Sequence, residues 1–173
     1  MFDKLFEFLK TVWAELVPYY VVSEMELACV LRFGKFKRTS TAGIHFKMPF
    51  ADVVYQYYVV TQTSHLTPQT LTTDDGKSIV VKAIVRFNIE DVKKYTLGVW
   101  DAHDAIGDTV QGIINTIVRT HTWENIVSGI EDEITKKAHE ALSDWGICVE
   151  KVTLSDLGEI RTIRLINNDT HVI

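Results

Sequence analysis

Residues 71–89 read LTTDDGKSIVVKAIVRFNI, and this stretch decides how the rest of the chain is interpreted. Asp74-Asp75-Gly76 is a turn signal, because aspartate side chains accept hydrogen bonds from nearby backbone amides and glycine tolerates positive φ. After this turn, apolar side chains occupy every second position of residues 79–89. The alternation predicts a half-buried strand in an antiparallel sheet.

The segment before the strands has a different, helical pattern. Apart from Phe8, which falls outside the apolar face, its large apolar residues at helical spacing are Phe2, Leu5, Phe6, Leu9, Val12, Trp13, Leu16 and Val17. In a helix these side chains lie within an arc of about 140°, and the charged side chains lie outside it. Pro18 ends the pattern. We predict an amphipathic, membrane-associating helix over residues 1–18; burial of the same face against protein is the alternative.

This helix is too short to cross a bilayer. No stretch of about 18 uncharged apolar residues occurs in the sequence, and the nearest candidate, residues 11–22, contains Glu15 and Pro18. We therefore expect the segment to lie in the membrane interface or to enter one leaflet.

Further strands are predicted on both sides of the central one. Residues 19–33 have one apolar face, formed by Met25, Leu27, Cys29, Leu31 and Phe33. Residues 35–42 are interpreted as a hairpin connection, and residues 53–63 as a strand that continues past Pro68 as a sheet edge. Residues 147–154 form the last strand, and a change of parity near Glu150 indicates a bulge.

Two helices are predicted between these strands. Apolar residues recur at helical spacing over residues 101–119 and again over 130–145, where Gly146 is placed as the C-terminal cap. Strands, then helices, then a strand is the order of an α+β fold. The expected architecture is a largely antiparallel sheet with two main helices packed on it, preceded by the N-terminal amphipathic helix.

Three segments of the chain resemble one known domain family in the same order. They are Thr73-Asp74-Asp75-Gly76, the pair Phe33-Gly34-Lys35 and GIHFKMPF at residues 43–50, and GICVEKVTLSD at residues 146–156. Together they resemble the band 7 domain of stomatins, prohibitins and flotillins, the SPFH superfamily. The resemblance implies such a domain over residues 19–166, with residues 167–173 as a short tail.

The resemblance also implies a function. It implies a non-enzymatic scaffold on the cytoplasmic face of a membrane that assembles laterally with copies of itself and organises or restrains membrane proteins, including membrane proteases. The long helical coiled coil of prohibitins and flotillins is absent from the sequence, so a low ring or a loose lateral array is expected. Membrane lipid and the chain itself are the expected partners.

Several other functions are disfavoured by composition and spacing. A net charge of −5 and a pI near 5.6 argue against nucleic acid as a partner. The six histidines and two cysteines show no metal-ligand spacing, and no phosphate loop or nucleophile motif is present. We expect no catalytic residues, no metal and no cofactor. Two distant cysteines without a cleavable signal peptide favour a reducing compartment.

A basic cluster stands out in this acidic chain. It comprises Arg32, Lys35, Lys37, Arg38 and Lys47. Such a cluster is either a solvated hairpin or a contact for anionic lipid headgroups, and its closeness in sequence to residues 1–18 favours the lipid contact. The alternative function is a soluble adaptor module whose N-terminal helix docks on a partner protein, such as a quality-control protease complex.

Overall fold

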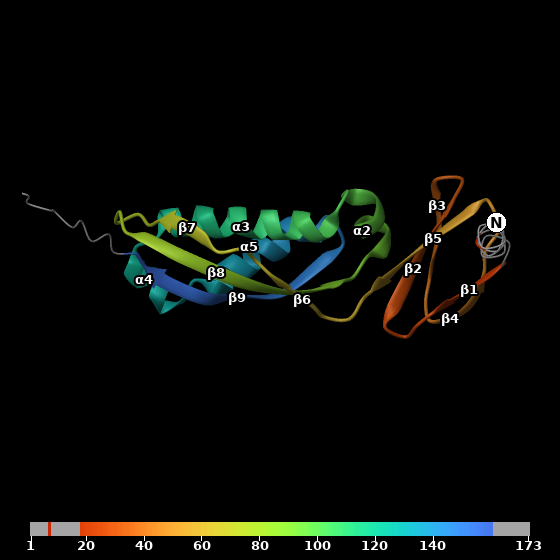
Figure 1. Ribbon diagram of the computed structural model, residues 1–173, viewed down its shortest axis with the longest axis horizontal. Coiled ribbons are helices and arrows are strands. Elements are labelled where there is room, and N and C mark those ends of the chain that lie inside the picture. Colours follow the sequence, from red (N-terminus) through yellow and green to blue (C-terminus); the bar gives the residue numbers. More distant parts are fainter. Residues whose placement is uncertain (1–6, 8–17, 161–173) are drawn as a thin grey trace, which may run out of the picture.

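The structure is a computed structural model that describes residue 7 and residues 18–160. These residues form an elongated molecule with two β-rich regions joined end to end (Figure 1). The first region contains β1 (Tyr19–Val22), β2 (Glu26–Arg32), β3 (Lys35–Ser40), β4 (Gly43–Phe46) and β5 (Asp52–Tyr58). The second contains β6 (Gln62–His65), β7 (Gln69–Thr72), β8 (Ser78–Ile89), α3 (Ala102–Thr120), α4 (Trp123–Gly129), α5 (Glu131–Ser143) and β9 (Ile147–Glu159). Helix α2 (Val92–Gly98) lies between them.

All strand pairs in the described residues are antiparallel, and they form three sheets. Strand β1 pairs with β4, and β2 lies between β3 and β5. Strand β8 is the centre of the third sheet, with β6 and β7 along one side and β9 along the other. The α+β class is confirmed, while the single sheet that we expected is divided into three.

The main core lies between the third sheet and helices α3 and α5. The predicted strand over residues 79–89 is confirmed as part of β8, and its alternate residues are buried: Ile79, Val81, Ala83, Val85 and Phe87. Both predicted helices are confirmed, with buried faces that include Ile106, Val110 and Ile117 in α3 and Ile134 and Leu142 in α5. Burying one such side chain contributes about 1.5–3 kcal/mol.

Strand β9 contains the predicted bulge. Arg86 is opposite Lys151 and Phe87 is opposite Val149, so Glu150 has no partner in the ladder. Along the other side of β9, side chains of α5 accept hydrogen bonds from its backbone. Val152 N donates to Thr135 Oγ1 at 2.9 Å, and Leu154 N donates to Glu131 Oε1 at 2.8 Å.

The predictions for the N-terminal half were wrong in three respects. Residues 19–33 form two strands in different sheets, because a turn closed by Glu26 N and Ser23 O at 3.1 Å separates β1 from β2. The supposed connection at residues 35–42 contains a strand, β3. Residues 53–63 are likewise shared between β5 and β6, which belong to different sheets. Alternation alone cannot show where a strand leaves one sheet for another.

Two side-chain assignments were also wrong. Met25 and Phe33, expected in the core, are 58% and 79% exposed because each lies in a turn at one end of β2. Gly146 does not cap α5 directly. The helix ends at Ser143, and Gly146, with φ +75°, forms the turn into β9. There its carbonyl accepts hydrogen bonds from Glu90 N and Asp91 N.

Candidate functional site

The end of the molecule formed by β1 and β4 exposes apolar side chains. Tyr19 lies opposite Phe46, and Val21 lies opposite Ile44, so the four side chains share one face of the two-stranded ribbon. Their exposed fractions range from 53% to 74%. Contiguous exposed apolar surface on a soluble domain usually marks a binding surface for protein or membrane. We call this face the apolar ribbon.

Two further exposed phenylalanines lie at neighbouring turns of the same region. Phe33 and Phe50 are 79% and 78% exposed, and Phe33 N donates to Ala51 O at 2.9 Å, which brings their turns together. Both residues have positive φ, 49° and 63° respectively. A bulky residue in the left-handed region is unusual, because it costs about 1–2 kcal/mol. Exposed aromatic rings held in such conformations make these two turns candidates for a functional contact.

An ion pair holds the two phenylalanine turns together. Arg32 Nε donates to Asp52 Oδ1 at 2.7 Å, and a second guanidinium nitrogen donates to Oδ2 at 3.0 Å. Asp52 Oδ2 also accepts from Met48 N at 2.8 Å. The hydrogen bonds from Arg32, opposed in part by burial, lower the pKa of Asp52 to about 2. Arg32 therefore stabilises the turn. The two guanidinium nitrogens that bind Asp52 are not free to bind a lipid headgroup.

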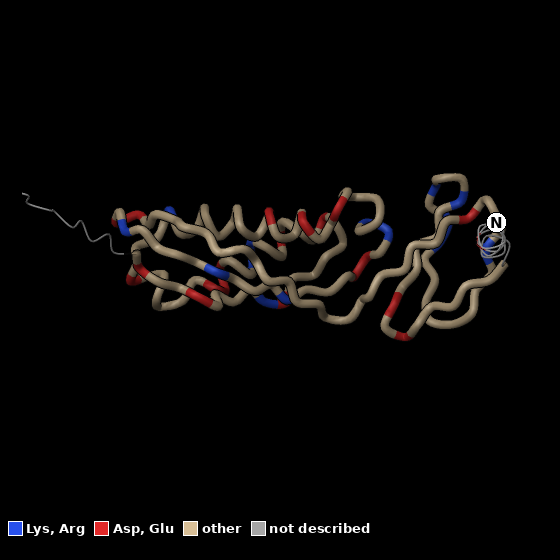
Figure 2. Tube along the Cα trace, viewed as in Figure 1, with Lys and Arg blue, Asp and Glu red and all other residues tan. Residues whose placement is uncertain are grey.

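The other predicted basic residues have different environments. Lys35, Lys37 and Arg38 lie on β3, where all three are exposed. The Arg38 guanidinium donates to the carbonyl of Phe46, which links β3 to the apolar ribbon. Lys47 follows β4 directly and is half-buried. The structure thus places these cations and the apolar ribbon in the same N-terminal region, seen at the right of Figure 2.

The predicted membrane anchor is not described. Phe2, Leu5, Phe6, Leu9, Val12, Trp13, Leu16 and Val17 all lie outside the described residues. Among the helices that are described, none has both the length and the apolar content needed to cross a bilayer. The described chain resumes at Pro18, directly before the apolar ribbon.

A second exposed aromatic surface lies at the junction of the two regions. It is a hollow of about 510 Å³ lined by Tyr55 and Tyr57 of β5, Tyr95 of α2, and Trp100 and Asp101 of the loop before α3. Tyr57 and Tyr95 meet edge to face, with ring centroids 5.0 Å apart. Trp100 is 96% exposed. This surface could not be predicted from the sequence, because its residues come from three separate segments.

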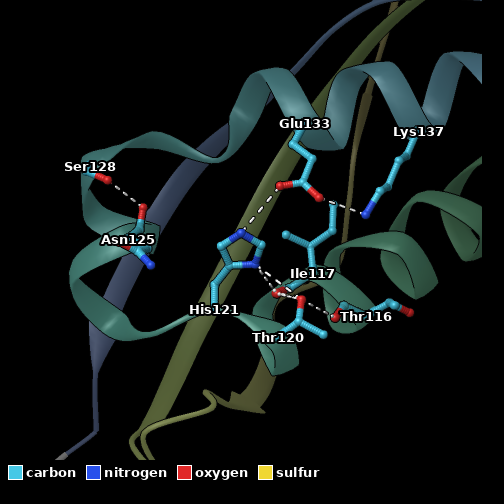
Figure 3. A network of polar contacts seen from close by, with 8 residues as sticks. All are labelled: Thr116, Ile117, Thr120, His121, Asn125, Ser128, Glu133 and Lys137. Carbon is cyan, nitrogen blue, oxygen red and sulfur yellow. Dashed lines mark hydrogen bonds and ion pairs between the residues drawn. The ribbon is translucent and has the colours of Figure 1, made fainter.

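A polar network near the opposite end holds the helices together (Figure 3). His121 Nδ1 lies 2.9 Å from Ile117 O, and Nε2 lies 3.4 Å from Glu133 Oε2. Lys137 Nζ is 2.7 Å from Glu133 Oε1, and this hydrogen bond lowers the pKa of Glu133 below its usual range. Thr120 also belongs to this network: its Oγ1 lies 3.2 Å from His121 Nδ1 and donates to Ile117 O at 2.9 Å. The network links the C-terminal end of α3 to α5.

The turn that opens β8 docks on the same helical junction. Asp74 N donates to His121 O at 3.1 Å, and Trp123 N donates to Asp75 Oδ1 at 3.2 Å. Gly76 has φ +78°, as a turn glycine allows. The sequence prediction of a turn is confirmed. Across residue 7 and residues 18–160, no group of three or more histidine, cysteine, aspartate or glutamate side chains could hold a metal ion.

Comparison with known proteins identifies the domain. The family described as SPFH domain / Band 7 family matches residues 20–164. Stomatin-1 of Caenorhabditis elegans is 29% identical over 141 residues, which cover 79% of this chain and 43% of that protein. Protein HflC of Treponema pallidum is 29% identical over 116 residues, 65% of this chain and 35% of that protein. Stomatin-like protein 3 of Mus musculus is 28% identical over 143 residues, 79% of this chain and 50% of that protein. The chain therefore spans half or less of the length of these relatives.

Proposed function

Because the chain belongs to the SPFH domain / Band 7 family, we propose that it is a membrane-associated, non-enzymatic scaffold that assembles laterally and organises or restrains membrane proteins. Proteins of this family are generally non-enzymatic scaffolds and are typically membrane-associated. The proposal assigns membrane contact to the N-terminal region, including the amphipathic segment of residues 1–18. Its clients are membrane proteins, with membrane proteases as one class.

The observation that carries the proposal is the apolar ribbon. It places Tyr19, Val21, Ile44 and Phe46 on one exposed face, and Phe50 projects from the adjoining turn. Residues 1–18 lead directly into β1, so the predicted anchor and this face are continuous in the chain. An interfacial helix and an apolar face that both reach the acyl boundary would bind more strongly than either alone, because binding scales with buried apolar area.

The exposed cations of β3 support the same orientation. Lys35 and Lys37 are exposed and have no acidic partner among the described residues. Near an anionic membrane surface each such cation contributes about 1 kcal/mol. We therefore expect binding to increase with the fraction of anionic lipid. Arg32 contributes less, since Asp52 already binds it.

Liposome flotation tests the proposal. The wild-type protein should float with vesicles that contain anionic lipid, and the double substitution Ile44→Asp with Phe46→Asp should reduce the floating fraction at least about tenfold. Val127→Asp, at a 58% exposed position of α4 in the other region, is the matched control and should float normally. Deletion of residues 1–17 measures how much of the vesicle binding depends on the predicted anchor.

Two outcomes would overturn the membrane assignment. The first is wild-type protein that stays at the bottom of the gradient with every lipid composition. The second is equal flotation of the wild type and the double variant after residues 1–17 are deleted from both. Failure of the wild type to float would favour the adaptor function, in which residues 1–17 dock on a partner protein.

A further inference from the structure

The two faces of the sheet in the β6–β9 region differ in the exposed charged residues that they carry near β6. Helices α3 and α5 cover one face of its sheet, where Ile79, Val85 and Phe87 are buried. The intervening residues of β8 point to the other face, which no described helix covers. We call this second surface the open sheet face. It contains exposed Arg86, which lies opposite exposed Lys151 of β9.

The Arg86 and Lys151 pair is unfavourable in the isolated chain. Like charges directly opposite each other in a sheet destabilise the strand pair. Neither side chain has a salt bridge or hydrogen bond to a carboxylate anywhere in the described chain. Strand β6 pairs with the other edge of β8, and there the uncharged Thr63 lies opposite Arg86. The pair therefore suits an acidic partner surface.

The outer surface of α3 supplies such a surface. Asp104 and Asp108 are exposed and lie one turn apart, on the side of the helix opposite the buried Ile106. No cation pairs with either carboxylate in the described part of the chain. The helix dipole favours an acid in the first turn, as at Asp104, but it does not account for Asp108 in the second turn. We call this surface, with Asp101 and Trp100 at its end, the acidic α3 face.

The two surfaces lie at the same level along the molecule. Asp104, Asp108 and His65 line one groove of about 260 Å³, so the start of α3 runs beside β6. Strand β6 in turn pairs with residues 84–87 of β8, and Arg86 is among them. Arg86 and Lys151 on the sheet layer, and Asp104 and Asp108 on the helix layer, therefore lie at the same position along the molecule but on opposite faces.

We propose that neighbouring copies assemble face to back, with the open sheet face of one copy, centred on Arg86 and Lys151, against the acidic α3 face of the next. This inference rests on the proposed function, because copies held on one membrane share one orientation, and surfaces at equal height then meet. The contact joins two different surfaces, so it repeats from copy to copy and produces a ring or an open row. Exposed Trp100 provides an aromatic anchor at the margin of this contact between copies.

Reciprocal charge reversal tests this contact. Variant one carries Arg86→Glu and Lys151→Glu, and variant two carries Asp104→Lys and Asp108→Lys. Each variant alone juxtaposes like charges, so its assembly on anionic vesicles or in detergent should weaken at least about tenfold. An equimolar mixture of the two should assemble again, because every contact between unlike variants restores opposite charges. Lys94→Glu with Lys136→Glu reverses two exposed cations outside both surfaces and is the matched control.

Mass photometry in detergent and chemical crosslinking on vesicles measure the assembly. The face-to-back contact is supported if assembly is lost in each variant, is recovered in the mixture and is normal in the control. Normal assembly of variant one or variant two would overturn it while leaving the proposed scaffold intact. Absence of recovery in the mixture, with both variants folded by circular dichroism, would overturn it as well. A wild-type protein that stays monomeric in detergent and on vesicles would overturn both the contact and lateral assembly.

Discussion

The Arg32 and Asp52 ion pair makes a quantitative prediction about stability. Asp52 accepts two hydrogen bonds from Arg32 and one from Met48 N, and its side chain is fully buried. Its pKa falls from the usual 3.8 to about 2. This fall corresponds to about 2 kcal/mol of preference for the folded state at neutral pH. Because the Arg32 side chain is 34% exposed, we expect solvent screening to keep the measured stabilisation at or below about 2 kcal/mol.

The pH dependence has a definite sign. The folded-state pKa lies below the unfolded one, so the stabilisation is complete above about pH 4 and is lost as the pH falls through about 2. We predict that Asp52→Asn lowers the free energy of unfolding by about 2 kcal/mol at pH 7. The gap between wild type and variant should narrow to less than about 1 kcal/mol at pH 2.

Urea denaturation followed by far-ultraviolet circular dichroism measures this gap at each pH. Hydrogen exchange of the β2 and β5 amides adds a local readout in case the two regions unfold separately. Glu24→Gln, at an exposed carboxylate of the same region, is the control and should change little. A double-mutant cycle with Arg32→Met should give a coupling energy of about 2 kcal/mol. Equal stability of wild type and Asp52→Asn at pH 7, or a gap that does not change between pH 7 and pH 2, would refute the reasoning.

Three further predictions concern single positions. Leu9→Glu should reduce vesicle binding by about one to two decades, because it removes a side chain worth about 1.5–3 kcal/mol on burial; flotation equal to that of the wild type would contradict the predicted anchor. Gly43→Val should lower the melting temperature without changing what the protein binds, because Gly43 has φ +130°; a fully stable variant that no longer binds lipid would instead make this segment a contact site. Gly146→Ala should destabilise the fold by at least about 2 kcal/mol, because its Cβ would lie 2.4 Å from Asp91 O at φ +75°; a variant with an unchanged urea midpoint would show that the turn can relax.

The strongest periodicities predicted the fold well. Strand β8 alternates over twelve residues and α3 keeps its apolar stripe for nineteen, so each pattern is long enough to exclude other interpretations. The bulge at Glu150 was also predictable, since an extra residue reverses the parity of the side chains that follow, here as far as the second register shift at Ser155. In β1, by contrast, Tyr19 and Val22 face opposite sides and both are apolar. Such a strand gives no indication of which face is buried.

The candidate surfaces were only partly predictable. The cations of β3 are adjacent in the sequence and were found directly, but Arg32 could not be separated from them until its partner Asp52, twenty residues later, was seen beside it. The apolar ribbon requires the register of β1 on β4, and the aromatic hollow brings together segments from three elements. These surfaces depend on tertiary pairing, on which local spacing carries no information.

The hydrogen bonds from β9 to α5 have a consequence for a protein crowded on a surface. An unprotected edge strand can add a strand from a neighbouring molecule, and repeated addition leads to amyloid-like aggregation. In β9 the outward amides of Val152 and Leu154 are already bound by Thr135 and Glu131. Those two positions cannot donate to an incoming strand unless α5 moves away. Copies at high local density can therefore meet through side chains on their faces while this edge resists β-augmentation.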